Sequence, residues 1–133
     1  MNISVKCFNQ DEINAFIMSY HTLGKCDVTG ENNVNIIDVN EIAEFFIDLL
    51  SIFSESTDGN SLVSIIKGDW DIFKSDDIAS TILNEICRKG NLSLNADSTV
   101  VYSDDVYSSV KKWEEIKETL KWKTPANKQK TES

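Results

Sequence analysis

Residues 38–53, DVNEIAEFFIDLLSIF, carry the strongest helical pattern of this 133-residue chain. Asp38 and Glu41 have the spacing of a capping box, a motif that begins helices. In the helix predicted over Asn40–Phe53, large apolar side chains recur at helical spacing and therefore share one face. They are Ile42, Phe45, Phe46, Leu49, Leu50 and Phe53. We expect this face to form the centre of the core.

Helical patterns also occur on both sides of this segment, and turn-forming residues separate them. Asn9 and Glu12 have the spacing of a second capping box. Ser75 precedes a pattern that ends in two basic residues and Gly90, where positive charge suits the helix dipole. The further helices are expected at residues 11–20, 62–68, 75–90 and 106–120.

Signals for β structure are few. Val34, Ile36 and Ile37 follow a turn-like stretch and predict a short strand, and Val100–Tyr102 is either a short strand or a packed loop. The sequence therefore predicts a mainly α fold, a single compact domain of about five helices, with at most a small β-hairpin near residues 24–37. The domain is expected to cover residues 1–123, and a flexible polar tail is expected over residues 124–133.

The chain is strongly acidic, with 22 acidic against 13 basic residues and a net charge of −9. Residues 1–58 hold ten acidic residues and two lysines, whereas residues 111–133 hold four acidic residues and seven lysines. Phosphate surfaces would repel such a protein. We therefore expect it to bind neither nucleic acid nor anionic membranes.

Several features predict a cytoplasmic protein. No apolar run approaches the roughly 20 residues that a membrane-spanning helix needs. The first residues lack the basic and apolar regions of a signal peptide. The cysteines are Cys7, Cys26 and Cys87, an odd number, so free thiols are expected.

Cysteine chemistry has two possible sites, and the sequence favours neither. Cys26 and His21 lack a recognisable orienting group and oxyanion hole, which a catalytic pair needs. Cys7, His21 and Cys26 could supply three zinc ligands, whereas structural zinc sites use four, often in closely spaced pairs. The positions that would complete the pairs hold Ser4 and Thr29, whose hydroxyls do not replace thiolates. We expect no metal and no cofactor.

Other catalytic machinery is missing from the residue inventory. A nuclease of the HEPN type uses an arginine followed by a histidine, but no histidine follows Arg88, the only arginine. The glycines do not form a phosphate-binding loop. The sequence therefore predicts a protein that is not an enzyme.

Acidic residues form two groups that could bind a partner. Glu41, Glu44 and Asp48 share a face of the predicted helix, and acidic residues also flank Trp70, an aromatic type common in interface hot spots. A solvated surface and a docking surface for a basic protein are both compatible with this pattern. The candidate partner-binding residues are Glu41, Glu44, Asp48, Asp69, Trp70, Asp71, Asp76 and Asp77.

Four motifs resemble the small N-terminal domain of bacterial proteins that often carry a RES domain or a HEPN-related partner. They are CFxxDxIxxFI from Cys7, GxCDxxG from Gly24, the helix opened by Asp38, and DWxIF from Asp69. Members of that family tend to have a second cysteine in each pair, giving a zinc-binding knuckle, where this chain has a serine and a threonine. RES domains resemble NAD-degrading toxins, and the resemblance implies that such activity belongs to a domain beyond these residues.

These observations predict a non-catalytic protein-binding domain of a bacterial toxin-associated system. It would be immunity-like or antitoxin-like and would neutralise a basic toxin domain by binding it through an acidic surface. The alternative is the regulatory N-terminal domain of a RES-type NAD-degrading toxin, here without its catalytic part.

Overall fold

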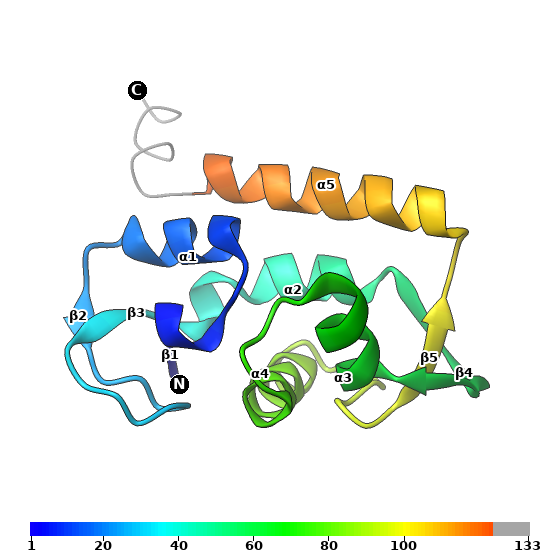
Figure 1. Ribbon diagram of the computed structural model, residues 1–133, viewed down its shortest axis with the longest axis horizontal. Coiled ribbons are helices and arrows are strands. Elements are labelled where there is room, and N and C mark those ends of the chain that lie inside the picture. The colour runs from blue at the N-terminus through cyan, green and yellow to red at the C-terminus, as the bar shows by residue number, and fades with distance from the viewer. Residues whose placement is uncertain (124–133) are drawn as a thin grey trace.

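The computed structural model describes residues 1–123 (Figure 1). These residues form a mixed α/β fold, with five α-helices and two antiparallel sheets of three and two strands. The prediction of a mainly α fold is therefore wrong, because strands make up 21% of the structure. The predicted tail at residues 124–133 lies outside the described residues. The elements are β1 (Asn2–Ser4), α1 (Asp11–Met18), β2 (Leu23–Gly24), β3 (Val34–Asp38), α2 (Ala43–Leu50), β4 (Phe53–Ser61), α3 (Leu62–Ile65), α4 (Asp76–Lys89), β5 (Thr99–Tyr102) and α5 (Val106–Trp122).

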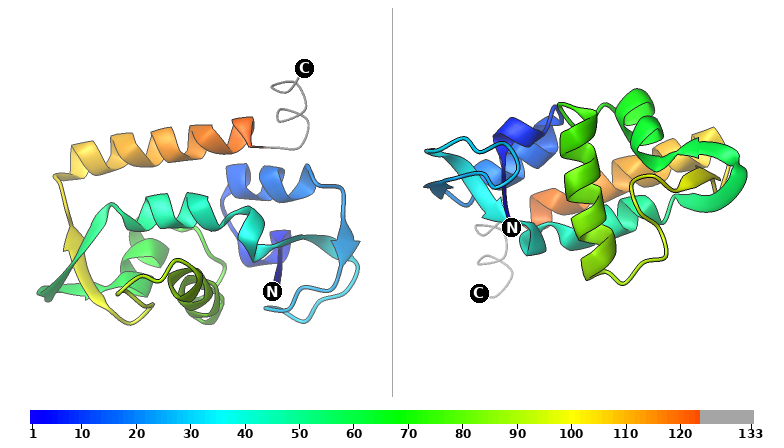
Figure 2. Two further views of the ribbon diagram at one scale, coloured as in Figure 1. Left: turned by 180° about the vertical axis from the view of Figure 1, so that it is seen from behind. Right: turned by 90° about the horizontal axis from the view of Figure 1, so that it is seen from below.

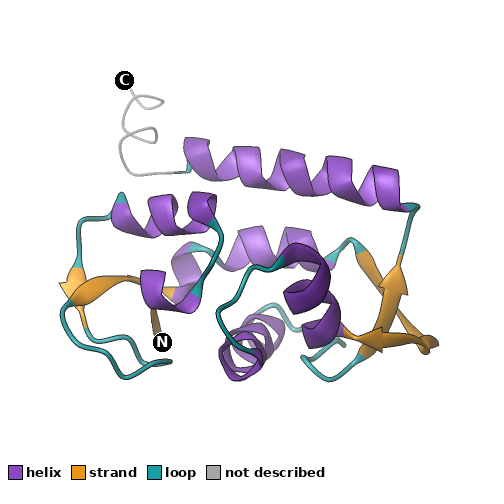
Figure 3. Cartoon of the chain, in the orientation of Figure 1, coloured by secondary structure: helices purple, strands orange, loops and turns teal. Residues whose placement is uncertain are grey.

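Three short helical turns join these elements. Two are 3-10 turns, η1 (Val5–Cys7) and η2 (Val39–Glu41), and the third is a π-helical turn, η3 (Ile66–Trp70). The two sheets lie at opposite ends of the molecule (Figure 3), and α5 runs across α1 and α2 (Figure 1). Helix α4 crosses beneath them and is seen along its length from below (Figure 2). No helix among residues 1–123 combines the length and apolar character that a membrane crossing requires.

The N-terminal sheet has the strand order β1-β3-β2. The hairpin expected near residues 24–37 exists as β2 and β3, with Leu23 opposite Asn35. The other edge of β3 pairs with β1, where Ile3 lies opposite Ile37. Strand β1 was not predicted, because a strand of three residues is too short to show an alternating pattern.

In the second sheet, β5 contains the residues 100–102 that were expected as either a short strand or a packed loop, whereas β4 was missed for a different reason. Strand β4 is polar, and Asp58-Gly59 reads as a break between helices. Its pairing with β5 is interrupted between Glu55 and Asn60. A Cβ at Gly59 would lie 2.0 Å from the carbonyl oxygen of Val100, so only glycine allows the two backbones to approach this closely.

Capping decides where the helices begin. Asp38 accepts a hydrogen bond from the Asn40 N–H at 2.9 Å and caps η2, so α2 begins only at Ala43. The predicted helix 40–53 is too long, because α2 ends at Leu50 and Phe53 opens β4. Gln10, not Asn9, caps α1. As predicted, Ser75 caps α4.

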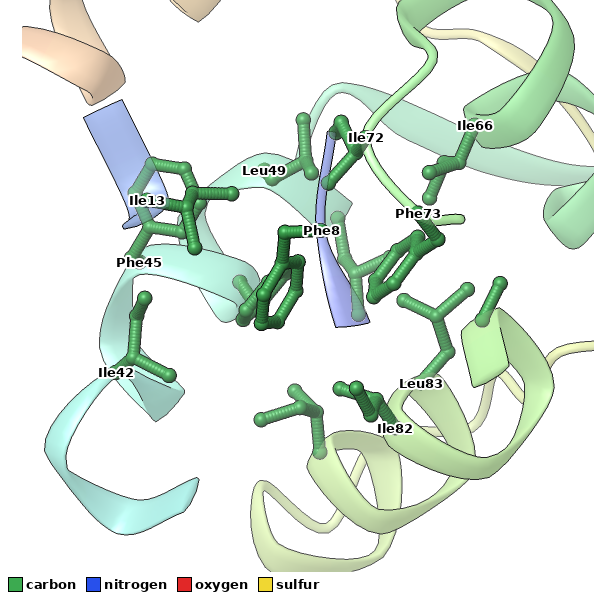
Figure 4. Close-up of a cluster of buried hydrophobic side chains, with 14 of the residues drawn as sticks. Phe8, Ile13, Ile42, Phe45, Leu49, Ile66, Ile72, Phe73, Ile82 and Leu83 are labelled. Atoms are coloured by element: carbon green, nitrogen blue, oxygen red, sulfur yellow. The ribbon is translucent and has the colours of Figure 1, made fainter. Parts of the chain in front are cut away.

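The core is built around three phenylalanine rings from different parts of the chain, two of which, Phe8 and Phe73, are labelled in Figure 4. Phe8 lies 6.0 Å from Phe46 and 5.3 Å from Phe73, and Phe46 lies 5.8 Å from Phe73, measured between ring centroids. All three side chains are buried. The rings join the N-terminal segment to α2 and to the segment before α4. The apolar face predicted for residues 42–53 therefore does form the centre of the core.

Replacing Phe46 by alanine should lower the free energy of unfolding by about 3–5 kcal/mol, because it removes a buried ring and leaves a cavity between two others. Urea denaturation of the full chain measures this change. Met18→Ala is the control, since this side chain is 52% exposed and its loss should change the stability by less than about 1 kcal/mol. Equal losses for the two variants would contradict the assignment of this core.

Candidate functional site

Two places in the structure bring chemically distinctive side chains together. The first is a buried pair of thiols, with the sulfurs of Cys7 and Cys26 3.7 Å apart. Cys7 is the last residue of η1, and Cys26 begins a turn. This turn is held against β1 by a hydrogen bond of 2.9 Å from the Asp27 N–H to the Asn2 carbonyl. Cys7, Cys26 and Cys87 are all buried and free of disulfides.

Two hydroxyl residues complete a small polar cluster around this pair. The Ser4 hydroxyl contacts both sulfurs, and Ser4 is fully buried. Thr29 contacts the Cys26 sulfur through its hydroxyl and its N–H, the latter at 3.5 Å. Ser4, Cys7, Cys26 and Thr29 thus lie together and are called the thiol cluster below.

His21 is not part of the thiol cluster. It is exposed and lies after α1, in the left-handed backbone conformation with a φ of 52°. Its backbone N–H donates a hydrogen bond to the Met18 carbonyl at 3.1 Å. Within residues 1–123, no group of three or more His, Cys, Asp or Glu side chains is arranged to hold a metal ion.

The environment treats the two thiols differently. Burial, together with the neighbouring Cys26, raises the pKa of Cys7 to about 12. Burial also acts to raise the pKa of Cys26, but hydrogen bonds from Ser4, Thr29 and the Val28 backbone outweigh it and lower this pKa below the usual value. Cys26 is therefore the first of the two to ionise. Its contacts stabilise a buried sulfur and do not include the imidazole that a catalytic pair would need.

The second place is a pocket of about 240 Å³ between the second sheet and α5. Asp69 and Trp70 come from η3, Tyr102 from β5, and Ser109 and Val110 from the first half of α5. We call this the aromatic pocket. Segments distant in the sequence form it, and only β5 and α5 are close neighbours along the chain.

Hydrogen bonding and stacking fix the walls of the aromatic pocket. The Tyr102 hydroxyl donates to the Asp69 carboxylate at 2.8 Å. Burial and this carboxylate raise the pKa of Tyr102 above its usual range, so the phenol stays a donor. The Trp70 ring lies 6.2 Å from Tyr102 and 5.5 Å from Trp113. Its indole nitrogen is buried without a well-formed hydrogen bond.

An unusual backbone leads into this pocket. The turn η3 is π-helical, and Asp71 ends it in the left-handed conformation with φ 48°. The side-chain amide of Asn9 donates to the Asp71 carboxylate at 3.1 Å and to the Phe73 carbonyl at 3.1 Å, which holds the turn in place. π-Helical turns and left-handed non-glycine residues both concentrate at functional sites.

The structure places only part of the predicted acidic group in this pocket. Of the eight predicted residues, Asp69 and Trp70 line it. The Asp71 carboxylate accepts a hydrogen bond from the Asn9 side chain, and the Asp76 carboxylate lies 3.8 Å from the Lys67 ammonium group. Asp77 is exposed in the first turn of α4.

Two of the other three predicted acids, Glu41 and Glu44, lie near the far end of α5, and the third lies on α2. Glu41 accepts a hydrogen bond from the Tyr20 hydroxyl at 3.0 Å, and Glu44 lies 3.2 Å from the Lys123 ammonium group. Asp48 is exposed on α2. The helix rises about 1.5 Å per residue, so roughly 20 Å of α5 separates Lys123 from Ser109 at the pocket. The predicted acidic surface is therefore divided into two.

Sequence reasoning missed three residues of the aromatic pocket, Tyr102, Ser109 and Val110. Tyr102 ends an apolar run that read only as a short strand or a loop, and Ser109 and Val110 read as ordinary positions of the last helix. No spacing in the sequence connects them with Asp69, because the pairing of β4 with β5 creates the neighbourhood.

Comparison of this chain with protein families, with curated proteins and with solved structures finds no significant match. The resemblance of its motifs to the N-terminal domain of RES-associated proteins stays a prediction. The residues of the thiol cluster and the aromatic pocket are therefore the basis for inferring a function.

The thiol cluster should become a metal site when its two hydroxyls are exchanged for thiols. We expect the double variant Ser4→Cys, Thr29→Cys to bind one Zn²⁺ much more tightly than the unaltered chain, because four converging thiolates satisfy tetrahedral zinc. Cobalt substitution followed by absorption spectroscopy would show tetrahedral thiolate ligation.

The same double variant carrying Cys7→Ser is the matched control and should bind more weakly. Circular dichroism establishes that each variant is folded. A folded double variant that binds zinc no better than the unaltered chain would show that the four side chains do not converge.

Proposed function

We propose that this chain is a non-catalytic protein-binding domain of a bacterial toxin-associated system. It is immunity-like or antitoxin-like and binds a basic protein partner. The observation that carries this proposal is the aromatic pocket, in which tryptophan and tyrosine rings stand beside a carboxylate. Binding hot spots combine such aromatic residues with a concave, partly desolvated site.

The surface next to the aromatic pocket supports a protein partner. Tyr107 is 82% exposed and Val110 is 43% exposed. They are three residues apart on α5 and so lie on the same side of the helix. Together with the half-buried Trp70, they extend the apolar lining of the pocket onto the open surface, where a protein can cover them.

Charge supports a basic partner. The net charge of −9 attracts a cationic protein over long distances and accelerates association. At the pocket itself, Asp69 pairs with no lysine or arginine among the described residues, so its charge is available to a partner. In the thiol cluster, by contrast, Ser4 and both thiols are buried and only Thr29 is partly exposed, so it offers a partner little surface.

A second candidate function is the regulatory N-terminal domain of a RES-type toxin. The convergence of the thiol cluster favours it, because Ser4 and Thr29 occupy the positions of the additional cysteines that the resemblance implies. An adjacent reading frame that encodes a RES-like domain would support this function over the first.

The proposed function is tested by co-expression with the proteins encoded by the flanking genes, followed by affinity measurement on any complex that forms. Val110→Lys should weaken binding of a basic partner at least tenfold, because it places a positive charge on the apolar wall of the pocket that Asp69 also lines. The variant should fold normally, since the side chain is partly exposed.

The matched control is Trp122→Ala, which removes another exposed large side chain, 65% exposed, at the far end of α5. It should leave the affinity unchanged. Equal affinities for Val110→Lys and the unaltered chain would count against the aromatic pocket as the binding surface. Substrate turnover by the purified chain would contradict a non-catalytic role.

A further inference from the structure

We infer that the aromatic pocket receives an arginine side chain of the partner, with its guanidinium group held by Asp69 and by the rings of Trp70 and Tyr102. This inference rests on the proposed function and names the chemical group that the pocket recognises. It follows from the hydrogen-bonding capacity, the aromatic surface and the size of the pocket.

The hydroxyl groups of the pocket are already used as donors, and its indole N–H, on Trp70, is buried. The Tyr102 hydroxyl is already committed to one oxygen of Asp69, and the Ser109 hydroxyl donates to the Asp105 carbonyl at 2.9 Å. The other oxygen of Asp69 receives no hydrogen bond from any residue that the structure describes. A ligand that brings several N–H donors and a positive charge satisfies this site, whereas a carboxylate or phosphate would be repelled.

No lysine or arginine among residues 1–123 forms an ion pair with Asp69. Lys67, in the same turn, has its ammonium group 3.8 Å from Asp76. Lys112, on α5, is paired with Asp104 at 2.6 Å. Both lysines therefore already have an acidic partner. The Asp69 carboxylate is available to a cation of a binding partner.

The aromatic surface favours a guanidinium group. The connected rings of Trp70, Tyr102 and Trp113 already hold one cation, because the Lys117 ammonium group lies 5.4 Å from the centre of the Trp113 ring. Trp70, half-buried in the pocket wall, offers a similar surface to a second cation. Arginine suits this place better than lysine, because its planar group stacks on rings, is less strongly hydrated and can donate two hydrogen bonds to one carboxylate.

The size of the pocket points to a single side chain. Its volume of about 240 Å³ falls below the 300–1,000 Å³ of pockets for drug-sized ligands. The aliphatic part of an arginine side chain can pack against Val110 while its charged end reaches Asp69.

The inference is tested by titrating the full chain with four peptides, acetyl-Ala-Ala-Xaa-Ala-Ala-amide, in which Xaa is arginine, lysine, citrulline or norleucine. NMR spectra monitor the indole N–H signals. We expect the arginine peptide to bind at least tenfold more tightly than the citrulline peptide, which has nearly the same shape without the charge. The norleucine peptide should bind as weakly as citrulline, and lysine should lie between.

Asp69→Asn should weaken binding of the arginine peptide about tenfold, and added salt should weaken binding to the unaltered chain. Asp48→Asn removes the same charge from an exposed position on α2 and should have no effect. Absence of arginine-peptide binding, equal binding of citrulline or norleucine, or unchanged binding by a folded Asp69→Asn variant would each overturn the inference.

These outcomes separate the inference from the proposed function. If the arginine peptide does not bind while Val110→Lys still weakens binding of a basic protein partner, the pocket binds protein by another group and only the arginine assignment is wrong. If the arginine peptide binds and Asp69→Asn weakens both the peptide and the protein partner, the two proposals are supported together.

Discussion

The structure depends on one contact between distant parts of the chain, the pairing of residues 7–9 with residues 72–74. Phe8 packs on Phe73, and two backbone hydrogen bonds flank the rings, from the Asn9 N–H to the Ile72 carbonyl at 2.8 Å and from the Lys74 N–H to the Cys7 carbonyl at 3.0 Å. On one side this contact fixes Cys7 beside Cys26. On the other, Asn9 holds the turn that presents Asp69 and Trp70. The thiol cluster and the aromatic pocket are thus positioned by the same short segment.

Local physics explains the parts of this fold that could be predicted from the sequence. The apolar face of α2 is readable because its phenylalanines and leucines repeat at helical spacing. Ser75 and Gly90 bound α4 because an N-cap hydroxyl and a residue that ends helices act within a few residues. The β2–β3 hairpin was visible for a similar reason, since Val34–Ile37 follows a turn.

The remaining parts depend on contacts between distant segments. Strand β4 has a polar sequence and forms a strand because β5 pairs with it. This pairing begins at Phe53 and explains why helix α2 ends at Leu50. The acidic residues of α2 and η3 stand in similar sequence patterns. In the structure, however, Glu44 lies beside one end of α5 and Asp69 lies beside its first half. Asp69 belongs to the pocket through Tyr102, a partner that no motif connects with it.

The contact between Phe8 and Phe73 also has a consequence for biosynthesis. The Phe8 ring packs against Phe73, which lies in the second half of the chain. The phenylalanine cluster therefore cannot assemble while residue 73 is still inside the ribosome. Until then Cys7 lacks the contact with residues 72–74 that fixes it beside Cys26 in the finished protein. The thiol cluster can therefore take its final arrangement only after residue 74 has been made.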